Sequence, residues 1–394
     1  MNVRVHLSLS LILNDVFCRN GVPLKVSKVC VVGARNVPDF IGGIETVCAK
    51  LYPELKNIVP EYDFTLFTRV KPKSKAEENF AGLKLKYIPT IDISGLETTF
   101  HTLLSILYAR LFIHPKIMHL HGIGPGFFAP LSRLFGFKTV VTHHAVDYQR
   151  PKWGGVGRAF LVKGERNACR YSHRVICVSQ AIKDDLGVRF ARNAGRYVTI
   201  RNGGSLDFHQ HVDSPEIMHT FGLSRGKYIL AVGRLEQTKA YHELIAAYQR
   251  IEQPKYKLVI CGVGIHAEQY VKDLTANASE NIIFVGFQNG ERLKTLYANT
   301  ALFIHTSHME GFCLVVSEAL SAKVPIALTD IPPHREFKLP EACIFPVGDI
   351  EAIETILRQD DFSEYQSLEA FEHQCQNTWL VCAEKHKALY HGLV

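Results

Sequence analysis

Short apolar runs alternate with longer amphipathic stretches along most of the chain. The first run covers residues 26–32 and ends at a glycine, and similar runs follow at 62–68 and 116–121. A second series of the same kind begins with residues 228–232 and 257–261. Strands that alternate with helices predict parallel sheets with helices on both faces. The pattern therefore predicts an α/β protein with two Rossmann-like doubly wound domains, in which ligands bind at the carboxyl ends of the strands.

The polar stretch at residues 201–225 lies between the two series and is the expected connection between domains. A length of 394 residues also fits two domains better than one, because single cores stop growing at about 250–300 residues. The apolar run at residues 5–13 resembles a signal peptide only faintly, since no small-residue cleavage site follows. We expect four parts: an N-terminal extension (1–25), a first domain (26–207), a second domain (208–370) and a C-terminal helical segment (371–394).

Composition excludes several classes of protein. With 47% hydrophobic and 21% charged residues, the chain has the composition of an ordinary globular protein. It holds no apolar run of 18 residues, so no transmembrane helix is expected. The ten cysteines are scattered and form no Cys-x-x-Cys pair. This spacing predicts buried thiols in a reducing compartment, with neither a disulfide framework nor a zinc site.

Positive charge gathers in one part of the chain. Residues 101–200 hold 15 Lys and Arg against 4 Asp and Glu, a local net charge of +11 in a chain whose total is +7. A solvated basic face explains this, and so does an anionic partner such as a membrane surface or a diphosphate-linked acceptor. Trp153 and Phe160 could then lie at a lipid headgroup boundary. No nucleic-acid-binding module is recognisable, so nucleic acid is not an expected partner. The cations around this helix-like stretch are Lys152, Arg158, Lys163, Arg166 and Arg170.

Two loops carry groups suited to a phosphate. Gly42 and Gly43 follow a strand and precede a helix, where backbone N–H groups can approach an anion. A plain glycine turn explains them equally well on local evidence. Arg234 and Lys239 follow the strand at residues 228–232 and could together bind one diphosphate. The Arg guanidinium offers several N–H donors in one plane, and the Lys ammonium offers a compact positive charge. Two surface cations on a loop are the alternative.

Two carboxylates, Glu310 and Glu318, have seven residues between them. Glu310 lies in a glycine-containing loop after a predicted strand, and Glu318 lies in the first turns of a predicted helix. The helix N-terminus between them can receive phosphate, while the carboxylates accept hydrogen bonds from hydroxyls. Alternatively, Glu318 has only a structural role, as an acidic residue in the first turn that the helix dipole stabilises.

A histidine pair, His143 and His144, follows the end of another predicted strand. Neighbours at a strand end point to opposite sides, so only one of them is expected to face a cleft. The spacing to Asp147 favours His144. A hydrogen-bonded packing histidine is the alternative for both.

Taken together, these segments resemble the retaining glycosyltransferases of family 4, which have the GT-B fold. The resemblance spans about residues 26–345, and the segment at 144–154 also resembles a bacterial subgroup associated with surface-polysaccharide assembly, including rhamnosyltransferases. The matching segments are Gly-Gly-Ile-Glu at 42–45, a strand and loop at 198–207, Gly-Arg-Leu at 233–235 with Lys239, and Glu-x7-Glu at 310–318.

The resemblance implies a transferase that moves a sugar from a nucleotide-diphosphate sugar to a glycan or polyprenyl-diphosphate-linked acceptor in surface-polysaccharide biosynthesis. It also implies that the C-terminal helical segment packs on the first domain. The implied catalytic residues are His144, Asp147 and Glu310. The implied donor-binding residues are Gly42, Gly43, Arg234, Lys239, Gly262, Gly264, Gly311, Phe312, Cys313, Leu314 and Glu318.

In this scheme Arg234 and Lys239 neutralise the diphosphate, Glu310 binds the transferred sugar and Glu318 binds the ribose. The chain departs from the family pattern at three positions near these residues. Ala240 and Cys313 stand where glycine is usual, and Val315 stands where proline is common.

The chain contains no Asp-x-Asp motif, the usual divalent-metal clamp of a nucleotide sugar. Transfer is therefore expected to need no metal and no cofactor, with cationic side chains and helix N-termini stabilising the leaving group. A nucleotide-sugar 2-epimerase of the same two-domain fold is the main alternative, and a non-enzymatic nucleotide-sugar sensor is another. The absence of Gly-x-Gly-x-x-Gly after the first strand disfavours a dinucleotide oxidoreductase. We expect the protein in the cytoplasm, as a free or peripheral protein of the inner membrane face.

Overall fold

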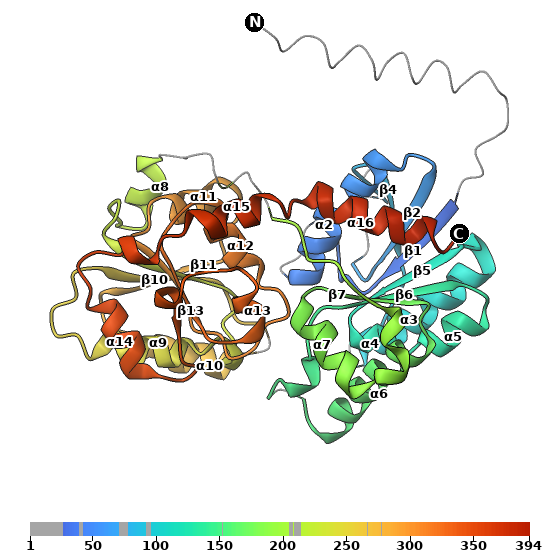
Figure 1. Ribbon diagram of the computed structural model, residues 1–394, viewed down its shortest axis with the longest axis horizontal. Coiled ribbons are helices and arrows are strands. Elements are labelled where there is room, and N and C mark those ends of the chain that lie inside the picture. The colour runs from blue at the N-terminus through green and yellow to red at the C-terminus, as the bar shows by residue number, and fades with distance from the viewer. Residues whose placement is uncertain are drawn as a thin grey trace, which may run out of the picture.

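The computed structural model contains two α/β domains, joined by a helix at the C-terminal end that returns to the first domain (Figure 1). The predicted N-terminal extension and Lys152 lie outside the described part of the chain. The residues described are 27–38, 42–70, 78–91, 96–151, 153–204, 208, 214–265, 267–276 and 278–394.

The first domain contains one eight-stranded sheet with the order β3-β4-β2-β1-β5-β6-β7-β8. All neighbouring strands are parallel except β3 and β4. The strands are β1 (Ser27–Val32), β2 (Tyr62–Thr68), β3 (Asn79–Phe80), β4 (Leu83–Tyr87), β5 (Ile117–His121), β6 (Lys138–His143), β7 (Arg174–Cys177) and β8 (Tyr197–Thr199). The helices are α2 (Gly43–Ile58), α3 (Glu97–Tyr108), η2 (Ala109–Ile113), α4 (Ile123–Gly126), α5 (Ala129–Leu134), η3 (Asp147–Gln149), α6 (Gly155–Tyr171), α7 (Gln180–Arg189) and η4 (Ala191–Arg196).

The second domain contains a six-stranded parallel sheet with the order β11-β10-β9-β12-β13-β14. The strands are β9 (Tyr228–Val232), β10 (Lys257–Cys261), β11 (Ile282–Gly286), β12 (Leu302–His305), β13 (Ile326–Thr329) and β14 (Ile344–Phe345). The helices from here to the C-terminus are α8 (Pro215–Thr220), η6 (Gln237–Lys239), α9 (Tyr241–Gln249), α10 (Glu268–Ala276), α11 (Gly290–Ala298), α12 (Leu314–Ser321), α13 (Pro332–Arg335), η7 (Glu341–Cys343), α14 (Ile350–Leu357), η8 (Ser363–Tyr365), α15 (Leu368–Cys375) and α16 (Trp379–His391).

Burial on both faces explains why the central strand β9 is apolar throughout instead of alternating. Every residue of β9 is buried, and its side chains divide between two core clusters, one on each face of the sheet. The predicted fold class, two Rossmann-like doubly wound domains, is confirmed.

Strand order places one candidate binding crevice in each domain. In the second sheet β9 is flanked by β10 and β12, so the direction in which strands are added reverses between β9 and β12. In the first sheet the same reversal occurs between β1 and β5. Doubly wound sheets bind ligands at such points, just beyond the carboxyl ends of the strands.

The helix α16 belongs to the first domain although the chain reaches it last (Figure 1). It packs along α2, and Trp379 and Tyr390 are buried in the core cluster of β1, β2 and α2. The two crossings between domains lie side by side, because Gly204 pairs with Thr378 and the Gly204 N–H donates to the Asn377 carbonyl at 2.7 Å. A Cβ at Gly203 would lie 2.4 Å from the Trp379 backbone, so this approach requires glycine.

No helix in the part of the chain that the structure describes is both long enough and apolar enough to span a bilayer.

Candidate active site

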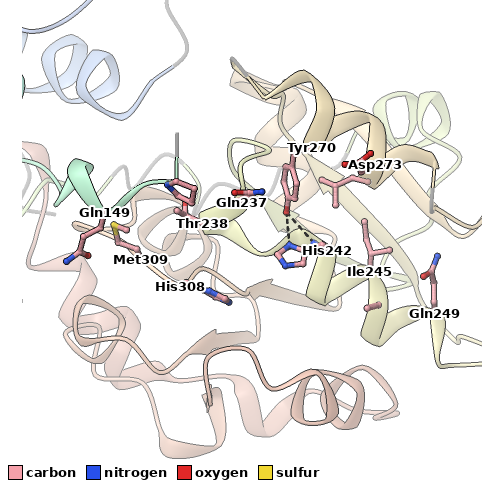
Figure 2. Close-up of a pocket in the computed structure, with 13 residues that line it drawn as sticks. Gln149, Gln237, Thr238, His242, Ile245, Gln249, Tyr270, Asp273, His308 and Met309 are labelled. Atoms are coloured by element: carbon pink, nitrogen blue, oxygen red, sulfur yellow. Dashed lines mark hydrogen bonds between the residues drawn. The ribbon is translucent and has the colours of Figure 1, made fainter. Parts of the chain in front are cut away.

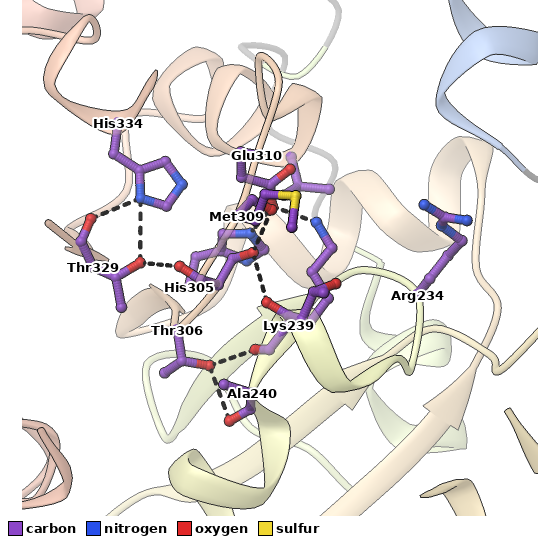
Figure 3. Close-up of polar contacts among 12 residues, drawn as sticks. Arg234, Lys239, Ala240, His305, Thr306, Met309, Glu310, Thr329 and His334 are labelled. Carbon is purple, nitrogen blue, oxygen red and sulfur yellow. Dashed lines mark hydrogen bonds and ion pairs between the residues drawn. The ribbon is translucent and has the colours of Figure 1, made fainter. Parts of the chain in front are cut away.

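The loops that follow β9 and β12 bring Lys239 and Glu310 into contact (Figure 3). Lys239 ends the short helix η6, and Glu310 follows β12. The Lys239 ammonium and the His305 Nε2, at 2.8 Å, both contact the same carboxylate oxygen of Glu310. Burial alone would raise the pKa of Glu310, but Lys239 and His305 outweigh it and hold this pKa well below its ordinary value. Glu310 is therefore a buried, ionised hydrogen-bond acceptor.

Backbone contacts hold these two loops together. The Thr306 hydroxyl donates to the Lys239 carbonyl at 2.8 Å, and the His308 N–H donates to the Thr238 carbonyl at 2.9 Å. These contacts hold the backbones of the two loops at a fixed spacing, so that the Lys239 side chain starts within reach of Glu310.

Arg234 lies on the other side of Lys239 from Glu310 (Figure 3). Its guanidinium is 3.4 Å from Glu236, and about a third of its side chain is exposed. Two cations and one carboxylate therefore line the end of β9, at the point where the strand order reverses.

The glycines near this end of the sheet have close neighbours. A Cβ at Gly262 would lie 1.8 Å from the Gly233 carbonyl oxygen, and one at Gly264 would lie 2.4 Å from Val271. Packing of adjacent loops therefore already accounts for glycine at Gly262 and Gly264, the two predicted donor-binding residues after β10.

Glu318 lies at the fifth position of α12, beyond its first turn. The predicted alternative, an acid held only by the helix dipole, is therefore wrong, because that effect fades within the first turn. The Tyr297 hydroxyl donates to Glu318 at 3.1 Å. Burial raises the pKa of Glu318 to about 7, although the Tyr297 hydrogen bond and the charge of Lys50 oppose this. Glu318 is thus poised between its acid and ionised forms near neutral pH.

The two predicted histidines have different surroundings. His143 is buried, and its Nε2 lies 2.9 Å from Glu165, which also accepts two hydrogen bonds from Arg189. His144 is partly exposed, and its Nε2 lies 2.9 Å from Nδ1 of His121. Burial and the neighbouring His143 lower the pKa of His144 to about 3, so its ring is neutral at physiological pH.

A buried hydrogen-bond network continues from His144 into the first domain. His121 Nε2 lies 2.7 Å from the Tyr52 hydroxyl, which lies 2.9 Å from His119 Nδ1. The same His119 nitrogen lies 2.6 Å from the Tyr390 hydroxyl on α16. Sequence reasoning missed this network, which fixes the His144 ring through residues of α2, β5 and the last helix.

The two domains meet at Gly311. A Cβ on Gly311 would lie 1.6 Å from the His144 carbonyl oxygen, so the backbones of the two loops are in direct contact. Beside them, Arg150 of the first domain donates to Glu236 of the second at 2.8 and 3.0 Å and also lies 2.9 Å from Asp147. Asp147 thus orients a cross-domain ion pair, which sequence reasoning also missed.

The remaining predicted residues lie at the N-terminal ends of α2 and α12. Gly42 precedes α2, and a Cβ there would lie 2.0 Å from the Glu45 carboxylate, whereas a Cβ at Gly43 would meet open space. Phe312 and Cys313 are buried, and Cys313 caps α12 in the left-handed region with φ of 73°, a conformation that favours glycine. Leu314 begins α12.

A cavity of about 780 Å³ adjoins the Lys239 loop (Figure 2). Gln149 and Pro151 of the first domain contribute to its wall. The second domain supplies Gln237, Thr238, His242, Ile245, Ala246, Gln249, Tyr270, Asp273, Leu274, His308 and Met309. Amide, imidazole and carboxylate groups beside an aromatic ring can bind a hydroxyl-rich ligand.

Two family models match the chain, "Glycosyltransferase Family 4" over residues 41–208 and "Glycosyl transferases group 1" over residues 213–359. An uncharacterized glycosyltransferase of Methanocaldococcus jannaschii is 32% identical over 169 residues, 41% of this chain and 43% of that protein. The O-antigen chain mannosyltransferase B of Escherichia coli is 23% identical over 272 residues, 66% of this chain and 71% of that protein. The match to the E. coli serotype-specific mannosyltransferase WbdA spans only 28% of that protein.

Two solved structures have the same overall fold. Sucrose-phosphate synthase from Thermosynechococcus elongatus superposes with a TM-score of 0.76 at 20% identity, covering 93% of this chain and 99% of that one. The Anabaena protein HepE in complex with UDP-glucose gives 0.73 at 17% identity, covering 93% and 100%. At these identities the likeness establishes the fold alone.

Proposed function

Because the chain belongs to the GT-B glycosyltransferases of family 4, we propose that it transfers a sugar from a nucleotide-diphosphate sugar to a glycan acceptor with retention of anomeric configuration. The observation that carries this proposal is the Lys239–Glu310 pair. It lies where the strand order of the second sheet reverses, beside the close contact of Gly311 with His144. An ionised acceptor and a movable cation thus meet in the interdomain cleft.

In the proposed complex, the donor diphosphate lies by Arg234 and Lys239. The Lys239 ammonium can turn from Glu310 towards a phosphate oxygen, which frees the carboxylate to accept hydrogen bonds from sugar hydroxyls. Glu318 accepts hydrogen bonds from the ribose. Cationic groups fixed before the reaction stabilise the charge that develops on the leaving diphosphate.

The proposed reaction proceeds on one face of the sugar. The bond from the anomeric carbon to the phosphate oxygen breaks, the bond to the acceptor oxygen forms, and the acceptor proton passes to the leaving diphosphate. His144 is neutral, so its ring can exchange hydrogen bonds with the sugar without placing a positive charge beside an oxocarbenium-like centre.

We further propose a glycan or polyprenyl-diphosphate-linked acceptor in surface-polysaccharide synthesis. Two relatives support this by name, the E. coli O-antigen mannosyltransferase and a Campylobacter jejuni N-acetylgalactosaminyltransferase that acts on a diphospho-undecaprenol substrate. The cavity beside the Lys239 loop has room for one or two sugar residues of such an acceptor.

A donor screen tests the proposal directly. Thermal shift with GDP-, UDP- and dTDP-sugars should identify the donor, because a ligand that binds only the native state raises the melting temperature. NMR of the product formed with that donor and a lipid-linked glycan should then show a new glycosidic bond of the donor's anomeric configuration. Release of a free epimerised sugar would instead indicate the 2-epimerase, and inversion would refute the retaining mechanism.

Donor affinity is expected to increase about tenfold between pH 6 and pH 8. The carboxylate form of Glu318 accepts both ribose hydroxyls, and it replaces the acid form as pH rises through about 7. Titration calorimetry should use the intact nucleotide sugar, because a free nucleoside diphosphate has a terminal phosphate that titrates near the same pH. Glu318→Gln should bind weakly with no such pH dependence. A dependence that persists in this variant would assign it to another group.

Transfer is expected to survive EDTA, because Arg234 and Lys239 take the place of a metal clamp at the diphosphate. The initial rate in the chelator should equal the rate without it. A loss that Mg²⁺ or Mn²⁺ restores would contradict this mechanism.

The outer face of α6 suits a membrane surface carrying anionic lipid. Arg158, Lys163 and Arg166 are exposed on it together with Val162. Phe160, one of the two aromatic residues predicted to meet lipid headgroups, is partly exposed and stacks on Phe127 with ring centroids 4.4 Å apart. We propose peripheral attachment through these cations.

Reversing Arg158, Lys163 and Arg166 to Glu is expected to weaken binding to anionic liposomes by at least about 100-fold, at roughly 1 kcal/mol for each cation lost, because the added carboxylates also repel the surface. Co-sedimentation at low and high salt measures it, since salt screens the attraction. The same reversal at Arg225, Lys272 and Arg292 of the second domain gives an equal change in net charge and should have little effect. Equal binding to neutral and anionic liposomes would leave α6 without this role.

A further inference from the structure

Four side chains with metal-binding atoms converge beneath the Lys239 loop. His305 ends β12, Glu310 and Cys313 precede α12, and His334 lies in α13. One potential ligand atom from each of the four lies within 4.8 Å of the other three. Ligands on a tetrahedral zinc ion are about 3.2–3.8 Å apart, so side-chain movements of about 1 Å would close the site.

A buried ring nitrogen of His334, without a partner among the described residues, is independent evidence that this site binds a ligand. Its side chain is fully buried, and its Nδ1–H donates to the Thr329 carbonyl at 2.8 Å (Figure 3). Because Nδ1 carries the proton of this hydrogen bond, Nε2 carries a lone pair in the neutral ring. That nitrogen has no hydrogen-bond partner in the described part of the chain. A metal-binding histidine has this arrangement, with the nitrogen that does not bind the metal held by a carbonyl.

Cys313 supports the same interpretation. Its φ of 73° costs a non-glycine residue about 1–2 kcal/mol, and its thiol is buried near Glu310 and His305. A glycine would remove that strain, but it would also remove the sulfur atom.

We propose that His305, Glu310, Cys313 and His334 bind one Zn²⁺ ion. Two imidazoles, one thiolate and one carboxylate form a donor set suited to zinc, whereas Mg²⁺ and Ca²⁺ prefer oxygen ligands alone.

Charge balance is maintained in the proposed zinc state. Zn²⁺ brings two positive charges, the Cys313 thiol loses its proton to solvent, and the Lys239 ammonium leaves Glu310 for the solvent-filled cleft. The His305 ring changes tautomer, so that the nitrogen now donating to Glu310 becomes a ligand. Because binding releases a proton, zinc affinity rises with pH.

Occupation of this site would take Glu310 away from the donor. This consequence rests on the proposed function: zinc would then inhibit transfer in competition with the nucleotide sugar, while the enzyme itself needs no metal. The metal site itself rests only on the four side chains.

Metal titration of the full chain tests the site without any activity assay. Co²⁺ should give the thiolate-to-metal charge-transfer absorption of a tetrahedral site, and Zn²⁺ should displace it. Cys313→Gly should abolish this absorption. His334→Asn, which keeps a donor for the Thr329 carbonyl, should weaken Zn²⁺ binding by at least the 10- to 100-fold typical of losing an outer partner.

Two further variants separate this site from general effects. Lys239→Met should tighten Zn²⁺ binding, because it removes the cation that competes for Glu310. His308→Asn alters a histidine outside the four ligands, bonded to Glu243, and should leave Zn²⁺ affinity unchanged. Absence of the thiolate absorption in the parent chain, or equal Zn²⁺ affinity in the parent and His334→Asn chains, would overturn the proposal. Neither result would affect donor binding, so failure of the metal site is distinguishable from failure of the transferase assignment.

Discussion

Replacing Lys239 by methionine, or Glu310 by glutamine, is expected to lower the rate of sugar transfer by about 10²- to 10³-fold, or about 3–4 kcal/mol of transition-state stabilisation. Lys239→Met removes the positive charge that balances the leaving diphosphate. Glu310→Gln removes the ionised oxygens that bind the transferred sugar. Both side chains are nearly buried, at 12% and 10% exposure, so water compensates poorly for either loss. The value of kcat/KM with the donor from the screen is the measurement.

Matched substitutions separate this effect from general loss of charge. Lys255→Met and Glu354→Gln remove a cation and a carboxylate from surface ion pairs of the same domain and should leave kcat/KM nearly unchanged. Thermal melting and circular dichroism should show that Lys239→Met and Glu310→Gln are folded. Near-normal turnover in both would mean that this pair is not the donor site.

Gly311→Ala is expected to lower transfer by about 10²-fold through a steric effect alone. The added Cβ would lie 1.6 Å from the His144 carbonyl oxygen, so the two loops would have to separate. A displacement of about 1 Å between reacting groups can lower a reaction rate by about 10²-fold. Unlike a change at Lys239, this substitution alters no charge and no hydrogen-bonding side chain.

Small-angle scattering should show a more open Gly311→Ala protein, while donor binding to the second domain changes little. Gly187→Ala is the matched control, because a Cβ in that helix meets nothing within 4 Å and alanine favours helix. A compact Gly311→Ala enzyme with normal turnover would show that this contact is not required for catalysis.

How far the fold could be predicted depended on burial. The runs at residues 62–68, 228–232 and 257–261 match β2, β9 and β10 to the residue, because nearly every residue of these strands is buried and most of them are apolar. The helix α3 was not predicted. Its buried residues include His101, Thr102 and Ser105, so the apolar periodicity that identifies a helix is missing.

For the candidate site, residues marked by local sequence could be predicted, whereas contacts between residues far apart in the sequence could not. Arg234, Lys239 and Glu310 were found because each lies in the segment between a clearly marked strand and the next long helix. The Arg150–Glu236 pair joins residues 86 positions apart, and His119 meets Tyr390 across 271 positions. No spacing rule within one segment can find such pairs. The four side chains of the proposed zinc site come from separate elements, so cysteine spacing alone cannot test for such a site.

The pairing of Gly204 with Thr378 makes the second domain an insertion within the first. The chain leaves the first domain at Gly204 and re-enters it at Thr378, and these residues pair in a β-bridge in which the Gly204 N–H donates to the Asn377 carbonyl. Deleting the residues between them and joining the ends by a short turn should give an independently folding first domain that includes α16. Simple truncation after Gly204 would instead expose the apolar face of α2 that Trp379 and Tyr390 cover. The boundary of the first folding unit is therefore set by a contact in space, and its sequence is discontinuous.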